Sequence, residues 1–198
     1  MGAEAYDDQW ARRAAAGESV HGEADLIERL LRGVDHVPRV LDAGCGTGRV
    51  AIRLAERGVD ACGVDVDDAL LERARTKAPT IPWHRGDLAT LRADEVPGPF
   101  DAIVLAGNVM IFVAPGTEGA VLHNLASRLA PGGLLVAGFQ LRSTARAGAL
   151  TADAFDALAR DAGLAPHARF STWEGAPFDG GNYLVTVDQR TRGQVSKR

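Results

Sequence analysis

The sequence contains only two cysteines and two methionines, and it has no long hydrophobic run. Two cysteines, Cys45 and Cys62, cannot form a disulfide framework, and their spacing is not that of a metal site. No stretch approaches the roughly 18 apolar residues that a membrane-spanning helix requires. The N-terminus, MGAEAYDDQW, lacks the apolar core of a signal peptide. We therefore expect a cytoplasmic protein with reduced thiols and no membrane partner.

The sequence also lacks an excess of basic charge. It has 22 Lys and Arg residues and 26 Asp and Glu residues, which gives a net charge of −4. This balance gives no electrostatic support for a nucleic-acid partner. The apolar share of 46% is ordinary, and 198 residues are enough for one domain with a substantial core. Neither an internal repeat nor a second domain is visible.

What the chain does have is a glycine-rich stretch at residues 39–50, RVLDAGCGTGRV. It begins as an apolar strand, continues through Gly44, Gly46 and Gly48, and resumes as a helix. Glycine tolerates positive φ and lets the backbone approach a ligand closely. A strand, a glycine turn and a helix in this order are typical of a nucleotide-cofactor site in an open α/β sheet.

Two details indicate which cofactor binds. A dinucleotide fingerprint has glycines at its first, third and sixth positions, and the sixth position here is Arg49. Asp42 lies two residues before the first glycine, where its carboxylate would repel a pyrophosphate and attract a sulfonium. S-adenosylmethionine (SAM) carries a sulfonium and NAD does not. The loop therefore predicts a SAM site.

The segment LDAGCGTG resembles motif I of the class I SAM-dependent methyltransferases. The resemblance implies that residues 44–48 line the methionine part of SAM and that Asp42 lies beneath it. We accordingly include Cys45 and Arg49 among the cofactor-binding candidates. It further implies a Rossmann-like, doubly wound, seven-stranded and mostly parallel sheet, with an antiparallel last strand and helices on both faces.

The remainder of the sequence predicts strands that alternate with helices. The expected strands are residues 39–42, 60–64, 81–85, 101–105, 134–139, 167–173 and 183–189. The expected helices are residues 23–32, 49–57, 67–77, 117–129 and 151–162. The last two strands are joined by a loop without room for a helix, so they should pair antiparallel. We divide the chain into an N-terminal helical segment or lid (1–36), a methyltransferase core (37–190) and a flexible tail (191–198).

Further candidate residues follow the predicted strands, at the edge where open α/β sheets bind ligands. Asp65 closes the second strand roughly 20 residues after the glycines, where a carboxylate can accept both ribose hydroxyls. The resemblance implies that Asp87 accepts from the adenine amino group, that Val66 and Leu88 pack against adenine, and that Ala106 presents a carbonyl to the cofactor's amino group. The alternatives are a helix cap for Asp65 and a turn for Asp87.

Residues for the methyl acceptor are less specific. By the same resemblance, Asn108 faces the acceptor and His21 lies over the cofactor, and these two are the candidate catalytic residues. The alternatives are a turn residue for Asn108 and a cap or surface residue for His21. The apolar residues 109–113 could line an acceptor site or pack as core. Arg142 and Arg146 could pair with an acidic substrate. Asp101 begins a strand at the opposite edge of the sheet, so we expect it to be structural.

The predicted function is transfer of a methyl group from SAM to a small-molecule acceptor with an oxygen or nitrogen nucleophile, by in-line displacement, leaving S-adenosylhomocysteine (SAH). Alignment supplies much of the catalysis, and a base is needed only if the acceptor must lose a proton. No Cys/His cluster indicates a metal. The chain could be a monomer or a homodimer. A SAM-binding protein without transferase activity and a nicotinamide-dependent oxidoreductase remain as alternatives.

Overall fold

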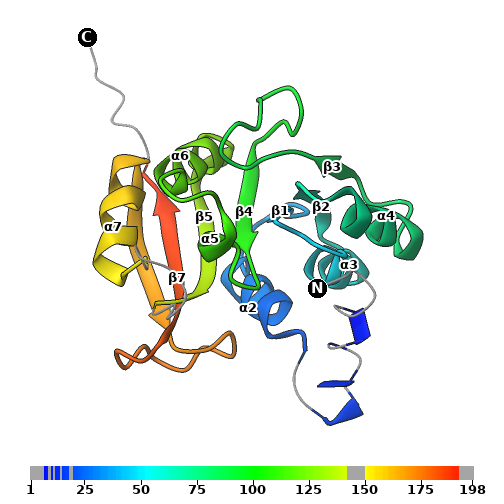
Figure 1. Cartoon of the computed structure of the whole chain (residues 1–198), viewed down its shortest axis with the longest axis horizontal. Coiled ribbons are helices and arrows are strands. Elements are labelled where there is room, and N and C mark those ends of the chain that lie inside the picture. The colour runs from blue at the N-terminus through cyan, green and yellow to red at the C-terminus, as the bar shows by residue number, and fades with distance from the viewer. Residues whose placement is uncertain are drawn as a thin grey trace.

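The computed structural model describes residues 7, 8, 10, 12, 13, 15–17, 20–141 and 150–191. Their centre is a seven-stranded sheet with the strand order β3-β2-β1-β4-β5-β7-β6 (Figure 1). The strands are β1 (Arg39–Ala43), β2 (Asp60–Asp65), β3 (Trp83–Arg85), β4 (Phe100–Leu105), β5 (Leu129–Gln140), β6 (Leu164–Phe170) and β7 (Tyr183–Arg190). The helices are α2 (Gly22–Leu30), α3 (Arg49–Glu56), α4 (Asp68–Lys77), α5 (Val109–Phe112), α6 (Glu118–Ser127) and α7 (Ala152–Asp161).

Strand directions follow the sequence prediction. β1 pairs in parallel with β2 and β4, β2 with β3, and β4 with β5. β7 pairs antiparallel with both β5 and β6, so it is the reversed strand of the described sheet. The central strands β1 and β4 are almost entirely buried, as expected of parallel strands covered on both faces. The predicted Rossmann-like fold with an antiparallel last strand is confirmed.

Helices cover both faces of this sheet (Figure 1). On one face α2 and α3 pack through apolar residues such as Ile27 and Leu54, which join one hydrophobic cluster with side chains of β1, β4, β5 and β7. On the other face α6 and α7 form a second cluster, in which the rings of Phe139 and Phe155 lie 5.2 Å apart. The apolar stripes of these helices therefore account for the layered arrangement.

Two glycines, Gly48 of the glycine loop and Gly63 of β2, leave room for the ring of Trp83. A Cβ atom on Gly48 or Gly63 would lie 2.5 Å from the Trp83 ring, closer than real contacts allow. The Trp83 Nε1 donates to the carbonyl oxygen of Ala78 at 2.9 Å, which satisfies the polar atom of a half-buried ring. The third glycine of the loop therefore serves packing as well as the turn.

Several boundaries differ from the predicted ones. Residues 109–112, where the sequence predicts neither a helix nor a strand, form the one-turn helix α5. β5 begins at Leu129 because its pairing with β4 continues across an irregularity, Phe100 opposite Leu129 and Ala102 opposite Leu134. β6 ends at Phe170 instead of 173. Residues 1–6, Arg142, Arg146 and residues 192–198 lie outside the described residues, so the expectations placed on them are untested.

Asp101 lies at the amino edge of the sheet, as the prediction places it. Its Oδ2 accepts from the backbone amide of Arg39 at 2.8 Å, and the Nε2 atom of His36 lies 3.1 Å from the same carboxylate. Hydrogen bonds to Asp35 and Asp101 raise the pKa of His36 above its ordinary value. These contacts join the start of β1 to the start of β4, away from the carboxyl edge.

Candidate cofactor site

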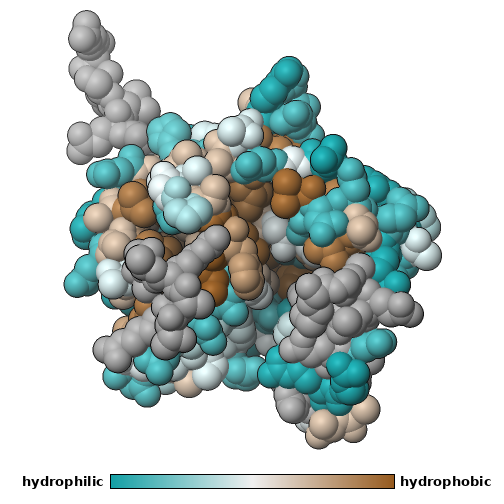
Figure 2. Space-filling view, viewed as in Figure 1, coloured by the Kyte–Doolittle hydropathy of each residue, from teal (hydrophilic) through white to brown (hydrophobic). Residues whose placement is uncertain are grey.

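A cavity of about 400 Å³ lies at the carboxyl edge of the parallel strands. Figure 2 shows brown, apolar surface in the hollow over this edge. Four strands contribute lining residues at their carboxyl ends: Gly44 after β1, Asp65 and Val66 at the end of β2, Gly86 after β3 and Ala106 after β4. The full lining is Gly44, Gly46, Asp65, Val66, Asp67, Leu70, Gly86, Asp87, Leu88, Ala106, Gly107, Val109, Phe112, Val113 and Ala114. We call it the first cavity.

The glycine loop forms one wall of the first cavity. Gly44, Gly46 and Gly48 have φ angles of 77°, 54° and 84°, which L side chains rarely adopt. The amides of Gly44 and Cys45 donate to the carbonyl oxygen of Val64 at 2.8 and 3.0 Å, so the turn is hydrogen-bonded to β2. A Cβ atom on Gly44 would lie 2.5 Å from Val109 of α5. Glycine is therefore required here both by φ and by space.

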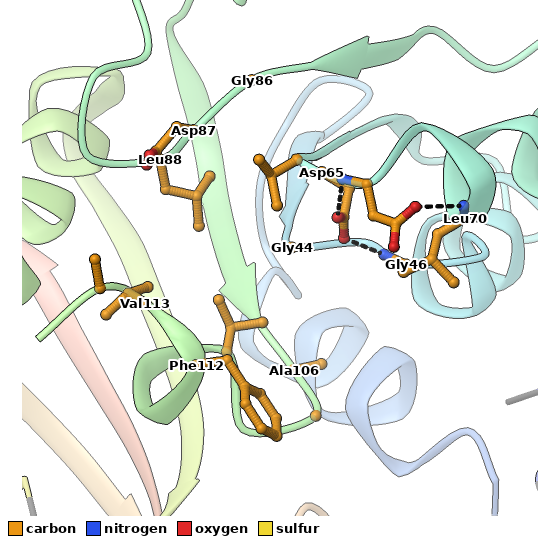
Figure 3. A pocket seen from close by; sticks show the side chains of 15 residues that line it. Gly44, Gly46, Asp65, Leu70, Gly86, Asp87, Leu88, Ala106, Phe112 and Val113 are labelled. Carbon is orange, nitrogen blue, oxygen red and sulfur yellow. Dashed lines mark hydrogen bonds between the residues drawn. The ribbon is translucent and has the colours of Figure 1, made fainter. Parts of the chain in front are cut away.

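Asp65 holds the loop against the turn that follows β2. Its Oδ2 accepts from the Gly46 amide at 2.8 Å and its Oδ1 from the Asp67 amide at 2.9 Å (Figure 3). The residue is only 9% exposed. Because a carboxylate offers about four acceptor positions, two remain for the hydroxyl groups of a ligand. The carboxylate is thus already oriented by the fold.

The turn after β3 supplies the opposite side. Figure 3 shows Asp87 and Leu88 on one side of the cavity, with Asp65 and Gly46 on the other. The Gly86 amide donates to the Asp65 carbonyl oxygen at 3.0 Å, and Asp87 Oδ1 accepts from the Ala89 amide at 2.9 Å. Leu88 is buried and Asp87 is exposed. An apolar surface and an exposed hydrogen-bond acceptor therefore lie next to each other.

Helix α5 forms an apolar wall of the first cavity, where the sequence left open whether residues 109–113 line an acceptor site or pack as core. Val109, Phe112 and Val113 line the cavity together with Ala114. Phe112 is 73% exposed, and Val66 on the other rim is 63% exposed. Apolar side chains left open at the mouth of a cavity are typical of a ligand site.

Five lining residues were missed as site residues by sequence reasoning: Asp67, Leu70, Gly86, Gly107 and Ala114. Asp67 caps α4, accepting from the amides of Ala69 and Leu70. Leu70 then lies on the first turn of α4, above the end of β2. The signal available in the sequence was the position of this turn directly after Asp65, since the first turn of the following helix borders the same strand end.

Asp42, Cys45 and Gly48 do not line the first cavity. Asp42 is 2% exposed, and its Oδ2 accepts from the Ala51 amide of α3 at 3.1 Å. Burial raises the pKa of Asp42 to about 7, against the opposing effect of that amide and of Arg49. Burial also raises the pKa of the Cys45 thiol above its ordinary range. The side chains of Asp42 and Cys45 are therefore buried within the protein and do not reach the surface of the first cavity.

Arg49 and His21 differ from expectation, since both line another cavity of about 410 Å³ beside α3, which we call the second cavity. Its lining is Asp7, Trp10, Val20, His21, Arg49, Ile52, Arg53, Glu56 and Lys77. Arg49 Nη2 lies 2.5 Å from Glu23 Oε1, and its guanidinium lies 3.8 Å from the Trp10 ring centroid. The first residue of α3 points toward α2, and this direction is set by helix packing, not by the glycine spacing.

The environment of His21 keeps its imidazole neutral. Burial is the largest cause lowering its pKa, and the positive charges of Arg53 and Arg49 lower it further. A neutral imidazole could serve as a base, but in this structure it borders the second cavity and not the first. The role of His21 as a catalytic base, or as a contact to the methyl acceptor, therefore remains a prediction.

Asn108 secures the start of α5. It adopts a left-handed conformation with φ of 69°, its Oδ1 accepts from the Gln140 amide at 2.9 Å, and its own amide donates to the Gly138 carbonyl oxygen at 3.2 Å. These bonds join the turn after β4 to the end of β5. The side chain is not among those lining the first cavity, and its contact with an acceptor also remains a prediction.

The described residues contain no group of three or more His, Cys, Asp or Glu side chains that could hold a metal ion. Within the same part of the chain, no helix is both long and apolar enough to cross a membrane.

Comparison with known proteins agrees with this geometry. A family model described as a methyltransferase domain matches residues 40–133. A TehB-like SAM-dependent methyltransferase from Corynebacterium glutamicum, a solved structure, is 34% identical, with a TM-score of 0.83 over 96% of this chain and 98% of that one.

Two curated relatives are similar over shorter stretches. Magnesium-protoporphyrin O-methyltransferase of Rhodobacter capsulatus is 33% identical over 60% of this chain and 58% of its own length. A dTDP-amino-sugar N,N-dimethyltransferase of Saccharopolyspora spinosa is 30% identical over 68% and 52%. The chain thus spans about half the length of these curated relatives. The glycine loop, the sheet order and the nearly full-length match together show that the chain belongs to the class I SAM-dependent methyltransferase family.

Proposed function

We propose that this chain binds SAM in the first cavity and transfers its methyl group to a small-molecule acceptor through an oxygen or nitrogen nucleophile. The observation that carries the proposal is the meeting of the glycine loop, Asp65 and the apolar wall of α5 around one cavity at the carboxyl edge. In open α/β sheets this edge is where ligands bind.

The charges around the first cavity fit SAM better than a dinucleotide. Among the described lining residues the ionisable side chains are Asp65, Asp67 and Asp87, all of them carboxylates. Carboxylates attract a sulfonium and repel a pyrophosphate. The chain's membership in the methyltransferase family removes the remaining reason to favour a nicotinamide cofactor.

Each wall would hold a different part of the cofactor. Asp65 would accept from the ribose hydroxyls with the acceptor positions left by Gly46 and Asp67. Asp87 would accept from the adenine amino group, while Val66 and Leu88 pack against the ring. SAM supplies a methyl group on a sulfonium when bound. The backbone of the glycine loop, with the carbonyl of Ala106, would orient the methionine part so that this methyl group faces the acceptor.

The acceptor itself is supported only as a class. Relatives are named for magnesium-protoporphyrin, glycine and a dTDP-amino sugar, so both O- and N-methylation occur among them. All three acceptors are small molecules, which supports a small-molecule acceptor here. We propose that Phe112 and Val113 form its apolar contact surface. Catalysis then depends mainly on alignment, with a base needed only for an acceptor that loses a proton.

We also propose that residues 1 to about 22, within the N-terminal segment of residues 1–36, cover the cofactor as a lid and that His21 acts there as a base or acceptor contact. The described residues Asp7 and Trp10 contact the glycine loop and Arg49, next to the first cavity, which supports a link between the segment and the cofactor. Slower hydrogen exchange in this segment after SAH addition would support the lid, and unchanged exchange would contradict it.

The proposal can be tested in two steps. Calorimetry should show binding of SAM and SAH in the micromolar range, about −8 kcal/mol, and no binding of NAD or NADP. Transfer of labelled methyl groups to a panel of amine, phenol and carboxylate acceptors should then reveal turnover. Binding of NAD or NADP without binding of SAM or SAH would overturn the cofactor assignment. SAM binding with no transfer to any acceptor would favour the alternative of a SAM-binding protein without transferase activity.

A further inference from the structure

A single carboxylate near the N-terminus contacts two separate elements of the core. Asp7 Oδ1 accepts from the Thr47 hydroxyl at 2.6 Å and from Lys77 Nζ at 3.1 Å, and Asp7 Oδ2 accepts from Arg73 Nε at 3.0 Å. Its side chain is 23% exposed. All of its hydrogen-bonding partners are more than 39 residues away in the chain, so these are tertiary contacts and not local turns.

The partners belong to two of the elements that border the first cavity, the glycine loop and α4. Thr47 lies between Gly46 and Gly48 and is fully buried. Arg73 and Lys77 lie on α4, the helix whose first turn contributes Leu70 to the cavity. Asp7 therefore joins the glycine loop to α4 without lining the first cavity itself.

The carboxylate is held in its ionised form. Burial by itself raises the pKa of Asp7, but hydrogen bonds from Thr47, Lys77 and Arg73 outweigh it and leave the pKa below its ordinary value. A charge-assisted hydrogen bond to a buried hydroxyl is stronger than a neutral one. The contact with Thr47 thus restrains the loop at physiological pH.

A second contact restrains the other end of the same loop. Arg49, which follows Gly48, pairs with Glu23 of α2, and the side chains of this pair are 12% and 8% exposed. The Arg49 guanidinium also lies over the Trp10 ring. Residues on both sides of Gly48 are therefore bound by the N-terminal part of the chain, and neither side chain lines the first cavity.

From these contacts we infer that Asp7 is a positioning residue for the cofactor: it fixes the glycine loop relative to α4 and so makes cofactor affinity depend on the N-terminal segment. This inference rests on the proposed binding of SAM in the first cavity. A loop that is already fixed loses less conformational freedom when it binds a ligand, so releasing it should weaken binding.

The test compares Asp7→Asn with Asp8→Asn, an exposed neighbour of the same type. Asparagine has only one side-chain oxygen to accept hydrogen bonds. Its NH₂ group would face one of the donors Thr47, Lys77 or Arg73. We expect SAH affinity to fall about tenfold in Asp7→Asn, which corresponds to roughly 1.4 kcal/mol, and to stay within about twofold of wild type in Asp8→Asn. Isothermal titration with SAH provides the measurement.

Variants of Thr47 separate positioning from folding. Thr47→Ser keeps the hydroxyl and should bind SAH like the wild type, whereas Thr47→Val removes it and should show the same loss as Asp7→Asn. Because both substitutions break the Asp7–Thr47 hydrogen bond, the double variant should lose less affinity than the product of the two single losses. The rate of hydrogen exchange at residues 44–48 should rise in Asp7→Asn and in Thr47→Val, and it should stay unchanged in Asp8→Asn and Thr47→Ser.

The outcomes distinguish this inference from the proposed function. If wild-type protein does not bind SAH, the cofactor assignment fails. If wild type binds and Asp7→Asn binds within about twofold of it, or if Asp8→Asn weakens binding equally, the positioning role is overturned. Should Asp7→Asn not fold, the Thr47→Ser and Thr47→Val pair decides the question, and equal SAH affinity in that pair overturns the inference.

Discussion

The two cavities have nearly the same volume, about 400 and 410 Å³, but the carboxylates that line them have different kinds of partner. In the first cavity Asp65 and Asp87 accept from backbone amides. In the second, Asp7 pairs with Arg73 and Lys77, and Glu56 pairs with Arg53.

This difference supports the proposal that the first cavity, and not the second, receives the cofactor. A carboxylate bound by one or two backbone amides keeps acceptor positions for hydroxyl or amino groups. A carboxylate paired with arginine or lysine has its charge compensated and its geometry set by the protein. The first cavity therefore has hydrogen-bonding capacity for a cofactor, and the second is a junction that joins the N-terminal residues to α3 and α4.

The largest expected effect is in the first cavity. Asp65→Ala should lower SAH affinity roughly ten- to a hundredfold, about 1–3 kcal/mol, because buried ribose hydroxyls and the Gly46 amide lose their acceptor. Titration calorimetry measures this loss. Asp101→Ala, at the opposite edge of the sheet, should lower the melting temperature and leave SAH affinity nearly unchanged. A larger affinity loss in Asp101→Ala would reverse the assignment of the two edges.

A second test addresses the glycine wall. Gly44→Ala places a Cβ atom 2.5 Å from Val109 at a φ of 77°, so we expect the free energy of unfolding to fall by about 2–3 kcal/mol together with SAH affinity. Gly58→Ala is the matched control, since its φ is also positive but nothing lies within 4 Å of the added atom. It should cost only about 1 kcal/mol, with SAH affinity retained. Equal losses in urea denaturation would show that space near Val109 is unimportant.

Asp42 allows a test by pH. Its pKa is about 7, so it becomes ionised as the pH rises from 6 to 8. An ionised carboxylate beneath the loop favours the sulfonium of SAM, and SAH lacks that charge. The ratio of SAM to SAH affinity should therefore rise by roughly three- to tenfold over this range. The same ratio in Asp42→Asn should not vary with pH, and a constant ratio in wild type would exclude an electrostatic role for Asp42.

The smallest effect is expected in the second cavity. Glu56→Gln removes the charge from the pair with Arg53, whose side chains are 36% and 55% exposed. An exposed pair of this kind contributes about 0.5 kcal/mol or less to stability. Melting temperature should change little and SAH affinity should stay within about twofold of wild type. A loss comparable to that of Asp65→Ala would mean that the second cavity also binds the ligand.

The sequence alone was sufficient for the fold class, for the glycine turn and for the position of Asp65 and Asp87. These features are local: glycines after an apolar strand permit the positive φ angles of a tight turn, and a residue at the carboxyl end of a parallel strand lies at one edge of the sheet. The antiparallel pairing of β6 and β7 followed equally from the short connection between them.

Only the tertiary structure decided which way the side chains of that loop point. Asp42 and Arg49 carry the charges nearest the glycines, yet Asp42 binds the Ala51 amide and Arg49 binds Glu23. The contact of Asp7 with Thr47 joins residues 40 positions apart, and no pattern in the sequence indicates it. Spacing along the chain sets where a turn forms, whereas the packing of α2, α3 and α4 around it determines which face of the turn remains for a ligand.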